Sequence, residues 1–70
     1  MLKLAERLYL LRKEHNLTQE ATAKELGISM KSYCRYEKKE REPTASILVQ
    51  MAKFYNVSLD YLVGLKDERQ

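Results

Sequence analysis

The sequence has few of the residues from which cross-links, metal sites and catalytic groups are made. Cys34 is its only cysteine, so no disulfide can form within the chain, and a cysteine-based metal site would need ligands from another chain. His15 is its only histidine, and no neighbouring residues are arranged with it as metal ligands or a triad; a helix end or a solvent-exposed position suits it better. We therefore predict that the protein is not an enzyme and holds neither a metal nor another cofactor.

Residues that break helices are also scarce, and no long apolar run is present. Two glycines and one proline among 70 residues, with 44% apolar and 33% charged residues, favour one compact, mostly helical domain over a disordered chain. No apolar run approaches membrane-spanning length, and the N-terminus lacks the apolar region of a secretion signal. We expect one domain over residues 1–65, a frayed tail over residues 66–70, and a cytoplasmic protein without a membrane partner.

Positive charge is concentrated in one stretch of the chain. The formal net charge is only +3, an excess that many proteins without a polyanionic partner also have. Between residues 30 and 42, however, five basic residues stand with three acidic ones; the basic ones are Lys31, Arg35, Lys38, Lys39 and Arg41. This distribution favours a polyanionic partner that contacts this stretch.

Apolar residues recur at helical spacing in five segments. Leu4, Leu8 and Leu11 repeat at intervals of four and three residues, which predicts a helix from Leu2 to about His15. Further helices are expected at residues 19–26, 30–38, 45–55 and 59–63, with Thr18, Ser29, Thr44 and Ser58 as their N-caps. The pattern therefore predicts an all-α fold of five helices.

The segment from Gln19 to Lys38 has the features of a helix, a turn and a second helix. Gly27 can adopt the positive φ that ends a helix, and Ser29 can cap the helix that follows. Ala23 is small where the first of these helices must let the second approach closely. These features predict a helix-turn-helix, with its second helix held at a steep angle to the first.

A helical wheel divides the second helix of this motif into two faces. Lys31, Arg35 and Lys38 fall on one face, while Tyr33, Tyr36 and Glu37 fall on the other. Such a helix fits the major groove of DNA, where arginine and lysine pair with guanine. Our candidates for base contacts are Met30, Lys31, Arg35 and Ser29. Our candidates for contacts to the DNA backbone are Thr18, Gln19, Ser32, Lys38, Lys39 and Arg41.

Two further residues of this region have two interpretations each. Glu37 flanks the buried side of its helix, as Arg12 flanks that of the first helix, so the two side chains either form a structural ion pair or remain independent surface charges. Cys34 lies near the face assigned to DNA and is either an inert filler or, less commonly, a redox switch.

The sequence resembles the Cro/CI-type helix-turn-helix family, also called the XRE family of bacterial and phage regulators. The resemblance rests on motifs that follow one another along nearly the whole chain. They are Leu11-Arg12, Leu17-Thr18-Gln19-Glu20, Ala23, Leu26-Gly27-Ile28-Ser29, Tyr33, Arg35-Tyr36-Glu37, Arg41-Glu42-Pro43 and Asn56-Val57-Ser58-Leu59-Asp60-Tyr61-Leu62-Val63-Gly64.

The resemblance implies a lambda-repressor-like domain of five helices in a bacterial or phage-encoded protein associated with the nucleoid. It also implies a phosphate contact from Gln19, base reading by Met30, Lys31 and Arg35, an ion pair between Arg12 and Glu37, and operator binding as a homodimer. Three residues depart from the family pattern. Thr22 stands where an apolar residue is usual and Ala45 is smaller than usual, which predicts looser packing around the second and fourth helices. Lys39 replaces a glycine after the third helix.

Together these features predict a sequence-specific regulator that binds double-stranded DNA. We expect a repressor that binds an inverted-repeat operator as a homodimer through the segment Leu59 to Leu65, and that occludes a promoter. With 70 residues leaving no room for a sensor domain, regulation would act through protein concentration, proteolysis or a regulatory protein partner. The alternative is a protein-interaction module of the same fold, such as an antitoxin or antirepressor partner, with little specific DNA binding.

Overall fold

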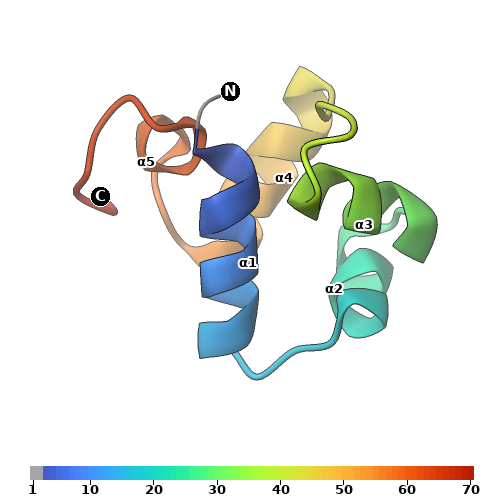
Figure 1. Cartoon of the computed structure of the whole chain (residues 1–70). Coiled ribbons are helices and arrows are strands. Elements are labelled where there is room, and N and C mark those ends of the chain that lie inside the picture. The colour runs from blue at the N-terminus through green and yellow to red at the C-terminus, as the bar shows by residue number, and fades with distance from the viewer. Residues whose placement is uncertain (1–2) are drawn as a thin grey trace.

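The computed structural model describes residues 3–70, and this part of the chain contains five helices and no strand. The helices are α1 (Leu4–Glu14), α2 (Gln19–Leu26), α3 (Met30–Glu37), α4 (Ala45–Tyr55) and α5 (Leu59–Val63). In Figure 1, α1 stands between the α2–α3 pair and α5. The predicted all-α class is confirmed, and the observed helices match the predicted segments closely. The predicted start of the first helix at Leu2 lies outside the described residues.

Four of the helices begin at the hydroxyl side chain that the sequence indicates. In each case the hydroxyl oxygen accepts a hydrogen bond, 3.0–3.3 Å long, from the backbone N–H three residues later. These N-caps are Thr18, Ser29, Thr44 and Ser58, as predicted. Each cap satisfies a backbone donor that the helix itself leaves free, and contributes about 1 kcal/mol to stability.

The turn between α2 and α3 depends on one glycine. Gly27 has a φ of 71°, in the left-handed region, and Ile28 N–H then bonds to the carbonyl of Ala23 at 3.0 Å. An added Cβ at Gly27 would meet no atom within 4 Å, so the backbone conformation alone explains the glycine. The chain is thereby turned from α2 into α3, with the carbonyls of Ala23 and Lys24 satisfied.

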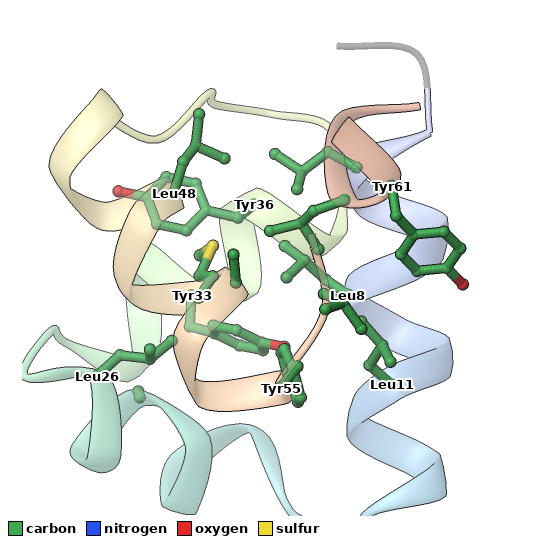
Figure 2. Close-up of a cluster of buried hydrophobic side chains, with 14 residues drawn as sticks. Leu8, Leu11, Leu26, Tyr33, Tyr36, Leu48, Tyr55 and Tyr61 are labelled. Carbon is green, nitrogen blue, oxygen red and sulfur yellow. The ribbon is translucent and has the colours of Figure 1, made fainter. Parts of the chain in front are cut away.

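The hydrophobic core lies where α1, α3, α4 and α5 meet, with α2 closing one side. Leu8, Leu11, Tyr33, Met51 and Leu62 are completely buried within it. Figure 2 shows Tyr33 and Tyr55 inside the cluster, and Tyr61 at its edge beside α1 with the hydroxyl pointing away. Each fully buried side chain of this size contributes about 1.5–3 kcal/mol, so this core accounts for most of the favourable free energy of folding.

Thr22 and Ala45, the two residues that depart from the family pattern and were expected to loosen packing, lie in different surroundings. Thr22 is completely buried in α2, and its hydroxyl donates to the carbonyl of Thr18 at 3.0 Å, so the polar group has a partner in the core. Ala45 is exposed at the start of α4. The expectation for Ala45 was therefore wrong, because its small side chain removes no core contact.

The C-terminal segment, residues 66–70, folds back onto α1 and α5. Arg69 pairs with Glu14 at 2.6 and 2.8 Å, and its carbonyl accepts a hydrogen bond from Ser58 N–H. Arg7 lies 4.0 Å above the ring centre of Tyr61 and donates to Asp67 at 3.1 Å. The segment expected to fray thus has specific contacts with α1 and with the start of α5. No helix within residues 3–70 is long and apolar enough to cross a membrane.

Candidate nucleic-acid interface

The predicted base-reading residues lie together at the start and on the outer face of α3. Met30 is 50% exposed, Lys31 and Ser29 are exposed, and Arg35 is half-buried. Tyr33 and Tyr36 face the opposite way, into the core, as predicted. The face of α3 that is turned away from the core therefore carries two cations and one flexible apolar side chain, a combination suited to guanine edges and thymine methyl groups.

The hydroxyls of Ser29 and Ser32 bond to each other as well as to the backbone. Ser29 Oγ accepts from Ser32 N–H at 3.1 Å and donates to Ser32 Oγ at 3.0 Å. The Ser29 hydrogen is thus directed to its neighbour, whereas the Ser32 hydroxyl can still donate. Of the two serines, Ser32 is the better placed to donate to a phosphate oxygen.

The predicted backbone-contacting cations follow α3 directly. Lys38, Lys39 and Arg41 are all exposed. Lys39 has a φ of 64°, so it keeps the left-handed conformation of the glycine that it replaces, and Glu40 N–H closes the turn on the carbonyl of Arg35 at 2.9 Å. The departure at Lys39 therefore leaves the turn intact but costs about 1–2 kcal/mol in a residue with a Cβ.

Arg12 of α1 and Glu37 of α3 form a two-pronged ion pair. Arg12 Nε donates to Glu37 Oε2 at 2.7 Å and Nη2 donates to Oε1 at 3.2 Å, with only 11% and 5% of the two side chains exposed. Arg12 Nη1 also donates to the carbonyl of Leu17 at 2.8 Å. The hydrogen bond to Glu37 is the main cause that raises the pKa of Arg12 above its usual value. The pair fixes α3 to α1 and to the α1–α2 loop.

Gln19, at the first position of α2, bridges two residues of α3. Its Nε2 donates to Glu37 Oε1 at 3.1 Å, and its Oε1 accepts from Cys34 Sγ at 2.9 Å. Sequence reasoning assigned Gln19 to a phosphate alone and missed both contacts. A wheel drawn for one helix gives no signal for them, because they depend on how α2 and α3 are rotated against each other.

A pair of tyrosine hydroxyls connects α3 to α4 in the core. Tyr33 and Tyr55 lie 3.0 Å apart, oxygen to oxygen, and both residues are buried. Burial is the largest cause that raises the pKa of each tyrosine above its usual value. His15, which follows α1, packs its ring edge against Tyr55 with the centroids 5.4 Å apart, and its Nδ1 lies 2.8 Å from the carbonyl of Leu11. His15 thus lies at the C-terminal end of α1, where its ring contacts a carbonyl of the last helical turn.

The comparisons with known proteins agree on the fold and the family. A family described as helix-turn-helix matches residues 8–62. The P22 c2 repressor in complex with a synthetic operator has a TM-score of 0.80 with 32% identity, over 84% of this chain and 89% of that one. The fold expected from the sequence, a lambda-repressor-like domain, is therefore confirmed.

Two curated relatives are similar in sequence. An uncharacterised helix-turn-helix transcriptional regulator of Bacillus subtilis, YobD, is 44% identical over 90% of this chain and 56% of its own length. The transcriptional repressor RstR of a cryptic phage in Vibrio cholerae is 44% identical over 99% of this chain and 63% of its own length. The chain thus spans somewhat more than half the length of these relatives. Their names describe regulators, which agrees with the prediction that the chain is not an enzyme. The chain belongs to the Cro/CI-type helix-turn-helix family.

Proposed function

We propose that the protein is a transcriptional regulator, most simply a repressor, that binds double-stranded DNA with α3 in the major groove. One observation carries the proposal: the outer face of α3 presents Met30, Lys31 and Arg35 on a helix that is fixed from behind by the pair of Arg12 and Glu37. The similarity to the P22 c2 repressor, whose structure was determined with an operator, supports it. Such a protein acts in the cytoplasm, at the nucleoid.

The contacts divide into those that read bases and those that hold the backbone. Arg35 and Lys31 are proposed to pair with guanine, with Met30 against a thymine methyl and Ser29 at a base edge. Thr18 and Gln19 at the start of α2, with Ser32, Lys38, Lys39 and Arg41, are proposed to contact phosphates. Only the first group discriminates between sequences, by about 1–3 kcal/mol for each good two-pronged pair.

A homodimer on an inverted repeat would place two copies of α3 in successive major grooves, about 34 Å apart. Leu59 is 41% exposed and Leu65 is 77% exposed, which supports the segment Leu59 to Leu65 as the contact between subunits. Bound in this way, the dimer would occlude a promoter. Its occupancy would change with protein concentration, proteolysis or a regulatory protein partner.

The test is a selection of bound sequences from random duplexes, followed by affinity measurements at several salt concentrations. We expect an inverted-repeat motif and an affinity that falls steeply with added salt. Arg35→Ala should relax the preference at one base pair in each half-site, whereas Lys39→Ala should weaken binding to all sequences about equally. Absence of any preferred duplex would refute the regulator and favour the interaction module. Equal loss on all sequences for Arg35→Ala would remove Arg35 from the reading set.

A further inference from the structure

The side chain of Gln19 is the middle of a polar chain that crosses from α1 to α2 and α3. Arg12 bonds to Glu37, Glu37 Oε1 accepts from Gln19 Nε2 at 3.1 Å, and Gln19 Oε1 accepts from Cys34 Sγ at 2.9 Å. Gln19 and Cys34 are half-buried, and Glu37 has only 5% of its side chain exposed. Four side chains thus meet behind the surface assigned to DNA.

The partners of Gln19 permit only one orientation of its carboxamide. The Glu37 carboxylate, paired with Arg12, is ionised and can only accept hydrogen bonds, so the amide nitrogen must face it. The amide oxygen then faces Cys34, whose S–H can donate to it. With the amide reversed, two acceptor oxygens would meet at Glu37, and the thiol would face an N–H group. Both contacts therefore select the same orientation.

We propose that Cys34 is a positioning residue, which acts with Glu37 to aim the free Nε2 hydrogen of Gln19 at a DNA phosphate. A carboxamide nitrogen carries two hydrogens, and Glu37 is the one acceptor that the described residues provide for it. Gln19 opens α2, where the backbone N–H groups also attract an anion. This inference rests on the proposed function, because it needs Gln19 to contact a phosphate.

The rival interpretation is that Cys34 only fills space between α2 and α3. Cys34→Ser keeps a donor and is close to cysteine in size, whereas Cys34→Ala removes both the donor and one side-chain atom. Serine should therefore lose less than alanine under either interpretation. The two interpretations differ in whether Cys34→Ala changes the amide signals of Gln19, and in whether its effect on DNA binding depends on Gln19.

The first arm measures the protein without DNA, by NMR of the glutamine side-chain amides. In the unsubstituted protein we expect one Nε2 proton of Gln19 to be shifted downfield of those of exposed Gln50, because it bonds to a carboxylate. Cys34→Ala should move the Gln19 signals toward those of Gln50, and Cys34→Ser should preserve them. Unchanged Gln19 signals in Cys34→Ala would overturn the positioning role.

The second arm measures affinity for the selected duplex and for an unrelated duplex. Cys34→Ala should weaken binding to both by the same factor, about twofold to tenfold, as expected for one hydrogen bond. Cys34→Ser should stay within twofold of the unsubstituted protein. In a Gln19→Ala background, Cys34→Ala should cost nothing further, because the group that it positions is absent.

The outcomes separate this inference from the proposed function. If the unsubstituted protein binds the selected duplex but Cys34→Ala weakens it equally with and without Gln19, the thiol is a filler and the regulator proposal stands. Equal losses for Cys34→Ser and Cys34→Ala would also overturn the positioning role, because serine keeps the donor. If the unsubstituted protein prefers no duplex, both proposals fail, whatever the amide signals show.

Discussion

Replacing both members of the pair formed by Arg12 and Glu37 should cost less than replacing either one. In the single variant Glu37→Met, the Arg12 guanidinium loses two hydrogen bonds and its counter-charge, and keeps one hydrogen bond, to the carbonyl of Leu17. In Arg12→Met, the Glu37 carboxylate loses its counter-charge and keeps the hydrogen bond from the amide of Gln19. In the double variant Arg12→Met with Glu37→Met, no charge is left buried.

The size of the effect follows from the burial of the pair. With 11% and 5% of the two side chains exposed, removing one partner leaves a desolvated charge, and such losses are about 3–5 kcal/mol. A domain of 70 residues has about 4–10 kcal/mol of total stability. Each single variant should therefore lose about 30% or more of its stability, whereas the double variant should lose less than about 2 kcal/mol, because methionines of similar length fill the site.

The assay is urea unfolding at pH 7, followed by circular dichroism, on the unsubstituted protein and the three variants. The coupling free energy between residues 12 and 37 comes from the double-mutant cycle. Lys13→Met, a substitution at the exposed residue that follows Arg12 on α1, serves as the control and should change stability by less than about 0.5 kcal/mol. Losses below about 1 kcal/mol in both single variants, or simple additivity in the double variant, would show that the pair behaves as two solvated charges.

Three further predictions concern the turn, the core hydroxyls and the C-terminal segment. Lys39→Gly should stabilise the protein by about 0.5–1 kcal/mol in urea unfolding, because relief of the positive φ exceeds the extra backbone entropy that glycine loses on folding, whereas Lys39→Ala should not. Above pH 10 the unfolded chain loses tyrosine protons that folded Tyr33 and Tyr55 retain, since burial raises their pKa values. Stability should therefore fall as the pH rises, by about 1.4 kcal/mol per pH unit for each tyrosine, and Tyr33→Phe should reduce that slope in urea titrations between pH 9 and 12. The hydrogen bond from Arg69 lowers the pKa of Glu14, so their contact is present above the ordinary glutamate pKa and should be lost as the pH falls through the lowered pKa of folded Glu14. Amide exchange of Ser58, compared with its intrinsic rate at each pH, should then become faster, and Arg69→Ala should show that faster exchange already at pH 7.

The helices, their caps and the turn were predictable because their causes are local. Thr18 and Ser29 cap helices through N–H groups three residues away, and Gly27 turns the chain through its own φ. The ion pair of Arg12 and Glu37 could also be predicted from the sequence, since both residues flank the buried faces of helices that pack together. The caps and the turn can be predicted from a few neighbouring residues. The ion pair needs one further assumption, namely which faces of the two helices pack together.

The remaining contacts depend on geometry that a single-helix pattern does not contain. The bond between Cys34 and Gln19 requires a specific rotation of α3 against α2, and the hydroxyl pair of Tyr33 and Tyr55 requires a specific depth of α3 against α4. The pairing of Arg69 with Glu14 joins residues 55 positions apart. Charged residues near the end of the sequence, such as Arg69, show no pattern from which such contacts could be predicted.

These contacts have a common consequence for α3. Apolar packing is non-directional and tolerates small rotations of a helix, whereas hydrogen bonds are directional and weaken steeply as they bend. α3 is bonded to α1 through Glu37, to α2 through Cys34 and Glu37, and to α4 through Tyr33. Three neighbours therefore fix its rotation from the inner side. Under the proposed function, substitutions on the outer face of α3 can change which bases are read while the angle at which they are read stays the same.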